Sequence, residues 1–288
     1  MAHKVYFLVT VDGDLRVGDS AQQNAAIAAI RRVHFGIGVY GCTSWMINEI
    51  DFDWTGQHAQ ALLDIVDSGE CVGVHDHQDT HYVESYESAL ALMQDSRRRL
   101  MGFLEKSGRR VPLQVHRNGS AIQSEALYRA AVDVGYSLVS DVWPGVRWYG
   151  RMVRDGSGPN PWRRMGESDP DAILMDNRVV PLGAIPWRHW PCNWLDFESQ
   201  EGPLLQIPIT CAPRVDETRM TEAAGKSGST AFLVLDTHPY DMQDPATGEV
   251  SPDRVSEYTR SLEWVRDRFQ ATFIRLDLVP ELLPVSSE

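Results

Sequence analysis

The chain alternates short, almost continuous apolar runs with longer stretches in which apolar residues recur every three or four positions. Continuous runs are typical of strands in parallel sheets, where other elements cover both faces. They predict strands over residues 4–11, 36–40, 71–74, 112–116, 137–142, 204–209, 231–235 and 271–276. Most of these runs are followed by a helical pattern, so we expect the strands to lie parallel.

The helical stretches cover residues 21–33, 57–67, 84–106, 125–134 and 251–268. Ser251 followed by Pro252 is a typical helix start, because serine caps the first turn and proline suits its first position. Strands that alternate with helices predict an α/β fold with the helices outside a parallel sheet. The length of 288 residues fits one α/β barrel, and no repeat or linker-like boundary interrupts it. We therefore expect a single domain over residues 1–288.

The pattern fails between about residues 143 and 203, in a segment rich in Trp, Pro and Gly. Its aromatic content argues against disorder, so we expect long, ordered loops over one face of the barrel. Aromatic rings in such loops can stack on the apolar faces of sugar rings. Trp143, Trp187 and Trp190 are candidates for this role, and Tyr240, from the end of a later strand, is another. For each tryptophan, structural packing is an equal alternative.

Reactive side chains stand at the ends of four predicted strands. A barrel gathers the carboxyl ends of its strands around one mouth, where barrel enzymes build their active sites. Any one of these side chains could be structural, but their joint occurrence at successive strand ends indicates a functional site. In chain order they are Asp12, Asp14, His75, His77, His81, Arg117 and His238.

The histidine cluster offers two ligand spacings. His75 and His77 are two residues apart, which places them on one side of a strand. His77 and His81 are four residues apart, which places them on one face of a helical turn. Either pair can bind a divalent metal ion, and the residues alone leave the choice open.

These motifs, in this order, resemble those of the polysaccharide deacetylase (carbohydrate esterase) family over most of the chain. Residues 10–14 (Thr-Val-Asp-Gly-Asp) resemble the opening Thr-Phe-Asp-Asp motif, and residues 75–81 resemble the His-x-x-x-His metal motif. Residues 115–119 (Val-His-Arg-Asn-Gly) are similar to the Arg-x-Pro-x-Gly segment, and residues 235–240 to the closing Leu-x-His motif. Within the family, the chain looks most like deacetylases of bacterial O-antigen biosynthesis.

The metal motifs depart from the family pattern in two places. Gly13 stands where the second aspartate is usual, which passes the metal-ligand role to Asp14. The family's histidine spacing favours His77 with His81, whereas its Gly-x-His lead-in favours His75. Two of the three histidines are therefore expected to bind the metal ion.

The resemblance implies a distorted (β/α) barrel of seven to eight parallel strands that hydrolyses an N-acetyl group on a sugar with a divalent metal ion, zinc above all. Asp12 would be the general base, Arg117 would pair with it and keep it ionised, and His238 would protonate the leaving amine. Asp236 or Asp241 would orient His238. The expected substrate is a small carbohydrate, such as a nucleotide-linked or lipid-linked sugar. The alternatives are a hydrolase of another non-peptide C–N bond in a small amide, and an inert carbohydrate-binding relative.

The charge balance argues against two classes of partner. The chain has 27 Lys and Arg against 40 Asp and Glu, a formal net charge of −13, which disfavours nucleic acid and anionic membranes because both are polyanions. No apolar run approaches the length of a bilayer, and the first run is too short for a signal peptide. Four scattered cysteines fit free thiols in a reducing compartment. We therefore expect a cytoplasmic protein without membrane insertion.

Overall fold

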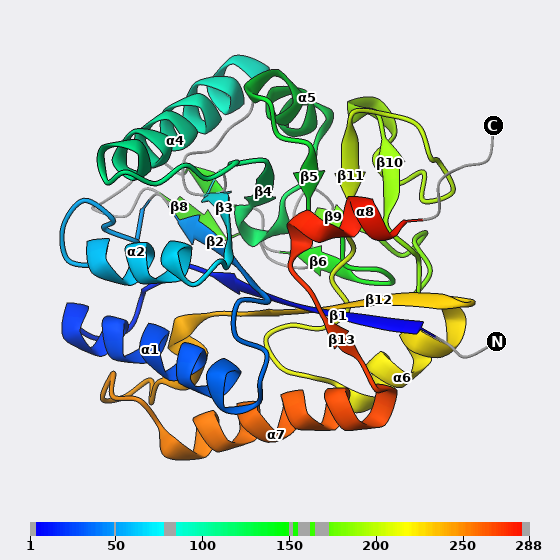
Figure 1. Ribbon diagram of the computed structural model, residues 1–288. Coiled ribbons are helices and arrows are strands. Elements are labelled where there is room, and N and C mark those ends of the chain that lie inside the picture. The colour runs from blue at the N-terminus through cyan, green and yellow to red at the C-terminus, as the bar shows by residue number, and fades with distance from the viewer. Residues whose placement is uncertain are drawn as a thin grey trace.

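A computed structural model describes residues 4–48, 50–77, 85–149, 152–154, 162–164 and 173–283. Its central element is a curled sheet with helices packed around the outside (Figure 1). Seven neighbouring strands of this sheet are parallel, in the order β11-β5-β4-β3-β2-β1-β12. The sheet strands are β1 (Lys4–Asp12), β2 (Thr43–Asn48), β3 (Cys71–Asp76), β4 (Val115–Asn118), β5 (Leu138–Val139), β10 (Trp187–His189), β11 (Leu204–Gln206), β12 (Thr230–Thr237) and β13 (Thr272–Phe273). The predicted α/β barrel of seven to eight parallel strands is confirmed.

The helices follow the strands in sequence and lie against the outer face of the sheet (Figure 1). The α-helices are α1 (Ser20–Gly36), α2 (Ala59–Asp67), α4 (Tyr86–Lys106), α5 (Glu125–Val134), α6 (Glu217–Lys226), α7 (Pro252–Phe269) and α8 (Val279–Leu282). The 3₁₀ turns are η1 (Gly119–Ala121), η3 (Pro191–Asn193), η4 (Pro239–Met242) and η5 (Leu276–Leu278). The predicted start of α7 is confirmed, since the side chain of Ser251 accepts a hydrogen bond from the backbone of Arg254.

The segment after β11 closes the barrel. Ile207 N–H donates to the carbonyl of Val139 on β5, with an N–O distance of 2.9 Å. Three residues later, Thr210 N–H donates to the carbonyl of Val234 on β12, also over 2.9 Å. One stretch of chain therefore bridges β5 and β12, which gives a distorted barrel.

Side-chain alternation divides the core of this barrel into two parts. On β1, Tyr6 and Leu8 belong to the smaller apolar cluster, which also contains Val234 of β12. Phe7 and Val9 belong to the larger cluster, which includes residues of the surrounding helices. Because alternate residues of a strand point to opposite faces, the smaller cluster fills the barrel and the larger one joins the sheet to the helices.

Two expectations about secondary structure are wrong. The predicted strand over residues 36–40 is the end of α1 and a turn, in which Gly38 and Gly41 have positive φ angles of 78° and 81°. The second strand is β2, which contains polar residues and was not predicted. The segment 143–203 also contains strands, where we expected only long loops. It contains β10 and two antiparallel pairs, β6 (Arg147–Tyr149) with β9 (Ile173–Asp176) and β7 (Met152–Arg154) with β8 (Trp162–Arg164).

All four cysteines are free thiols, as the sequence predicts. Within the described ranges, no helix combines the length and the apolar character that a membrane crossing requires.

Candidate active site

The site lies inside the barrel, at the carboxyl end of its strands. On β1, Asp12 lies two residues beyond Thr10 and shares the inward face of Leu8. The same alternation carries Arg117 inward from Val115 on β4, and Asp236 inward from Val234 on β12. The pattern that fills the barrel with apolar side chains therefore also brings these charged groups together at its carboxyl end.

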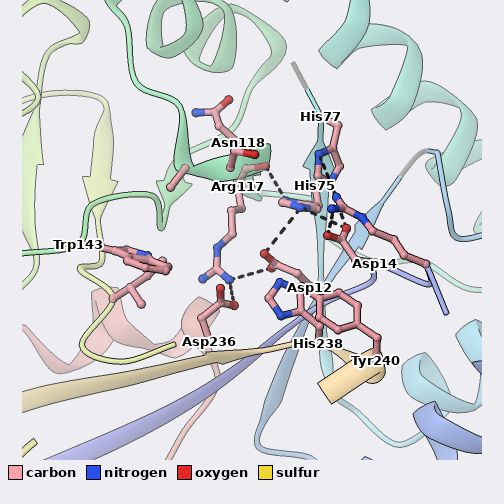
Figure 2. Close-up of a pocket in the computed structure, with 14 residues that line it drawn as sticks. Asp12, Asp14, His75, His77, Arg117, Asn118, Trp143, Asp236, His238 and Tyr240 are labelled. Atoms are coloured by element: carbon pink, nitrogen blue, oxygen red, sulfur yellow. Dashed lines mark hydrogen bonds and ion pairs between the residues drawn. The ribbon is translucent and has the colours of Figure 1, made fainter. Parts of the chain in front are cut away.

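These groups line a pocket of about 310 Å³. Figure 2 shows the labelled histidines and Asp14 next to Asp12, which contacts Arg117 on its other side. The lining consists of Asp12, Asp14, Arg16, His75, His77, Arg117, Asn118, Ser120, Ala121, Trp143, Ile209, Asp236, His238 and Tyr240. Of the predicted residues, all three in catalytic roles and three of the four metal ligands lie here. His81 lies outside the described residues.

Asp14, His75 and His77 form a group whose ligand atoms all lie within 4.8 Å of one another. The Nε2 atom of His77 lies 3.0 Å from Asp14 Oδ1, and Nε2 of His75 lies 3.6 Å from the same oxygen. All three residues are buried. Two imidazoles and one carboxylate that converge in this way are a donor set typical of a divalent metal site with open positions.

The hydrogen bonding of His75 fits such an ion. Its Nδ1 lies 3.2 Å from the backbone carbonyl of Arg117, which can only accept, so Nδ1 carries the proton. Burial lowers the pKa of His75 well below 6.5, and the ring is therefore neutral. The lone pair of Nε2 then faces the carboxylates of Asp12 and Asp14 at 3.7 and 3.6 Å. A lone pair set against two carboxylates is unfavourable without a cation between them, so these residues fit a metal ion.

Asp14 is held ionised. Burial by itself would raise its pKa, but the hydrogen bond with His77 and the charge of Arg16 outweigh burial, and the pKa lies well below the usual value. Asn48, at the end of β2, also donates a hydrogen bond to Asp14 Oδ1. An ionised carboxylate is the form that binds metal.

Arg117 is a buried cation shared between two carboxylates. Its Nη1 donates to Asp12 Oδ1 over 2.8 Å and also to Asp236 Oδ1. Thr10 Oγ1 lies 3.0 Å from the same Nη1 and donates to Asp236 over 2.9 Å. Nε and Nη2 of Arg117 are fixed by the carbonyl and the hydroxyl of Ser140, at 2.8 and 3.0 Å. The predicted pair of Arg117 with Asp12 is therefore present, as part of a larger network.

Arg117 nevertheless does not give Asp12 a low pKa. Complete burial raises the pKa of Asp12 to about 7, the charge of Arg117 opposes this rise, and the charge of Asp236 adds to it. The expectation that Arg117 keeps Asp12 ionised is thus corrected, because burial outweighs the charge of a guanidinium that two carboxylates share. A carboxylate with this pKa exchanges protons readily at neutral pH.

His238 stands where β12 passes into η4, and Asp241 orients it. Oδ2 of Asp241 lies 3.0 Å from Nδ1 of His238 and accepts from its backbone N–H over 2.8 Å. Burial would lower the pKa of His238, but the bond to Asp241 and the charges of Asp236 and Asp12 raise it to about 9. The ring of Tyr240 stacks on His238 with centroids 4.5 Å apart. His238 is therefore protonated at neutral pH, and Asp241 rather than Asp236 is its partner.

A tight turn after Arg117 forms another part of the pocket wall. A Cβ atom on Gly119 would lie 2.7 Å from Nδ1 and 2.8 Å from Cα of His77, so only glycine fits there. Ser120 and Ala121, which follow, both have positive φ angles, 53° and 51°. Left-handed backbone is costly for residues with a Cβ and is concentrated at functional sites. The Asn-Gly sequence after the arginine thus makes room for His77.

The predicted substrate-binding aromatics lie in three places. Trp143 and Tyr240 line the pocket. Trp190 is exposed and is not part of the lining. Trp187 is fully buried in a small cluster with Val142 and Val180, and its Nε1 donates to a backbone carbonyl. A ring without exposed surface has no face to offer a sugar, so Trp187 has a packing role.

Two residues of the site had no signal in the sequence that we used. Arg16 lines the pocket, where its Nη2 lies 2.9 Å from Asp14 Oδ2. Asn48 contacts Asp14 from β2, a strand that the apolar pattern did not reveal. Arg16 is only two residues from Asp14, so a search of the residues around each predicted ligand would have found it.

No family model and no curated protein matches the sequence. Solved structures do match. A "putative polysaccharide deacetylase" from Mycobacterium smegmatis matches with a TM-score of 0.59 at 10% identity, over 100% of this chain and 96% of that one. A 4-alpha-glucanotransferase from Thermococcus litoralis matches with a TM-score of 0.50 at 11% identity, over 94% of this chain and 38% of that one.

A further protein described in the same words, from Bordetella bronchiseptica and involved in O-antigen biosynthesis, matches at 12% identity over 91% of this chain and 90% of that one. Its TM-score is 0.45, too low to support a conclusion. The Mycobacterium smegmatis likeness covers the whole chain at low identity, which is a statement about fold. The chain therefore has the distorted (β/α)-barrel fold of the polysaccharide-deacetylase type.

Proposed function

We propose that this chain is a metal-dependent deacetylase that hydrolyses the N-acetyl group of a sugar or of a nucleotide-linked or lipid-linked sugar. The observation that carries the proposal is the coexistence, in one pocket, of a metal-ligand group, a carboxylate with a pKa near neutrality and a protonated histidine. The barrel fold shared with a protein described as a polysaccharide deacetylase is consistent with it.

Asp14, His75 and His77 would hold the metal ion, and their mixed nitrogen and oxygen donors suit zinc. A divalent ion supplies two things at such a site, polarisation of the acetyl carbonyl and a lower pKa of bound water. The buried Asn48 orients the carboxylate of Asp14, and the Arg117 carbonyl orients the ring of His75. Such outer partners fix the direction in which the ligand atoms point.

Asp12 is the proposed general base. Its Oδ1 is engaged by Arg117, whereas Oδ2 lies 3.7 Å from Nε2 of His75 and faces the metal-ligand group. Oδ2 is therefore the atom that takes the proton of the attacking water. A pKa of about 7 makes Asp12 basic enough to accept the proton while a large fraction of it stays ionised at neutral pH.

His238 is the proposed general acid. Asp241 holds Nδ1, which leaves Nε2 to carry a proton to the amine as the C–N bond breaks. Amines leave poorly unless they are protonated, and a pKa of about 9 keeps the ring charged until that moment. Base and acid thus have environments that keep them in opposite protonation states, as acid–base catalysis requires.

The test is release of acetate from N-acetylglucosamine and from its nucleotide-linked form. We expect activity that a chelator removes and added zinc restores, and an Asp12→Asn variant that binds zinc but turns over about 10²- to 10⁴-fold more slowly. Release that persists in the chelator, or full turnover by Asp12→Asn, contradicts the mechanism. Cleavage of a small cyclic amide in place of acetyl groups would favour the other C–N hydrolase, and zinc binding without any turnover an inert relative.

A further inference from the structure

Arg16 is a cation that the proposed mechanism does not use. It follows β1 and lines the same pocket as Arg117, but its side chain is 51% exposed whereas that of Arg117 is 2% exposed. Its Nη2 lies 2.9 Å from Asp14 Oδ2, and its Nε lies 3.4 Å from Asp51 Oδ2. All three nitrogens of the Arg117 guanidinium contact buried partners. Arg16 is therefore the guanidinium of the pocket lining that a ligand can reach.

A metal ion would change the contacts of Arg16. Nη2 of Arg16 lies 3.1 Å from Nε2 of His77, the atom that also faces Asp14 in the metal-ligand group. The same Nη2 lies 3.5 Å from Nδ1 of His77, so it faces the imidazole ring and does not occupy the in-plane lone pair of either nitrogen. A divalent ion held by His77 would repel a guanidinium at this distance. Binding of the ion therefore weakens the contact of Arg16 with His77 and frees donors of Arg16.

Further donors of Arg16 are already available. Within the part of the chain that the structure describes, Nη1 has no hydrogen-bond partner. Asp51 contacts Nε and is itself partly exposed, so it can keep the side chain at the pocket rim. A guanidinium presents its donors as a planar fork that matches the oxygens of a phosphate or a carboxylate.

The charge balance of the lining favours an anion. The lining has three cations, namely two guanidinium groups and His238, which its raised pKa keeps protonated. Its three carboxylates belong to Asp12, Asp14 and Asp236. With Asp12 counted as ionised, these formal charges cancel. A divalent metal ion then adds positive charge that no group of the lining offsets, in a pocket where most of the lining residues are buried.

We propose that Arg16 binds an anionic group of the substrate beside the metal-ligand group, so that the substrate class is an N-acetylated sugar that carries a phosphate or a carboxylate. This inference rests on the proposed function and narrows its substrate. The shared chemistry is a planar or tetrahedral oxyanion, and the choice between phosphate and carboxylate is left to the substrates compared below.

The experiment compares the wild-type protein, Arg16→Gln, Arg16→Lys and the control Arg214→Gln, all loaded with zinc. Arg214 is exposed to a similar extent, pairs with Glu257 and is not part of the pocket lining, so its variant removes the same charge elsewhere. Acetate release is measured from N-acetylglucosamine, its 1-phosphate and N-acetylmuramic acid. Calorimetric titration with inorganic phosphate provides a reading that does not depend on turnover.

In Arg16→Gln, we expect kcat/KM for the preferred anionic sugar, divided by kcat/KM for N-acetylglucosamine, to fall about 10- to 100-fold, with a similar loss of phosphate affinity. Arg16→Lys should recover part of both, because it keeps the charge and loses the fork. Arg214→Gln should change neither by more than about 2-fold. An unchanged ratio together with unchanged phosphate affinity in Arg16→Gln overturns the proposal. If the wild type released no acetate from any sugar, the proposed function would fail, and the titration would still decide whether Arg16 binds anions.

Discussion

The Asp241→Asn substitution tests the environment of His238, the proposed general acid. Asp241 accepts through one oxygen, Oδ2, from the imidazole of His238 at 3.0 Å, from its backbone N–H at 2.8 Å and from the Thr237 hydroxyl at 3.2 Å. Asparagine has the same shape, and its amide oxygen can still accept from the backbone. The substitution therefore removes the charge that faces His238 while the turn η4 keeps its capping contact.

The expected change follows from the pKa of His238, which the structure raises from 6.5 to about 9. At 1.36 kcal/mol per pKa unit, this rise corresponds to roughly 3 kcal/mol of preference for the charged ring. A hydrogen bond to a charged group contributes about 1.5–3 kcal/mol, and the charges of Asp236 and Asp12 remain in the variant. We therefore expect the pKa of His238 in Asp241→Asn to fall by about 1 to 2 units, to roughly 7 to 8.

The sign for stability follows from the same shift. Because the pKa of His238 is higher in the folded than in the unfolded protein, its contribution to the free energy of unfolding is complete below about pH 6.5 and is lost as the pH rises through about 9. Asp241→Asn should therefore be less stable than the wild type at pH 6, and the difference should shrink towards pH 10.

NMR titration of the imidazole in the metal-free protein measures the pKa directly, and denaturant unfolding at several pH values measures the stability difference. Asp244→Asn is the control, since Asp244 is exposed and makes a local turn contact in the same segment. A pKa of His238 that stays near 9 in Asp241→Asn would refute the assignment of Asp241 as its partner. So would a stability difference that does not depend on pH.

Three further variants probe the metal ligands and their surroundings. Asp14→Ala should weaken zinc binding by more than the roughly 10- to 100-fold that loss of an outer partner costs, and an unchanged affinity in competition with a chelating dye would remove Asp14 from the ligand set. Gly119→Ala should lower the free energy of unfolding by about 1–3 kcal/mol in thermal unfolding, because the new Cβ would meet the backbone of His77. The control is Gly102→Ala in α4, where no atom lies within 4 Å of the new Cβ. This variant should instead raise the free energy of unfolding by up to about 1 kcal/mol. Arg16→Gln should bind zinc about 2- to 5-fold more tightly in the dye assay, since a neighbouring cation is removed, and weaker binding would contradict the repulsion between Arg16 and the metal ion.

The apolar pattern predicted the barrel because its strands are buried on both faces. β1 is buried from Val5 to Asp12, and the run of apolar residues ends where the site begins. β2 was not predicted because some of its buried residues are polar. Thr43, Ser44 and Asn48 are polar and yet fully buried, because each has a partner that is distant in sequence or supplied by the fold. Ser44, for example, accepts from the backbone of Leu276 over 2.9 Å.

The sequence predicted those residues of the site that stand at the ends of apolar strands. Asp12, Arg117 and His238 stand at strand ends in the sequence, and the barrel brings them together. The strand spacing of His75 and His77 brings both histidines onto Asp14, since β3 continues to Asp76. The contact of Asp236 with Arg117 was not predicted, because it spans 119 positions of sequence and no local pattern encodes it.

Burial and the sharing of Arg117 together explain why Asp12 can serve as a base. A guanidinium paired with Asp12 alone would hold its pKa low and make it a weak base. Complete burial penalises ionisation of Asp12 most, and the charge of Asp236 adds to this effect, so the pKa rises to about 7. Thr10 and Ser140 hold the other contacts of the Arg117 guanidinium in place. The strength of the base is therefore set first by burial and then by the second carboxylate on the same cation, so the network that holds Arg117 in the barrel interior also tunes the chemistry at its mouth.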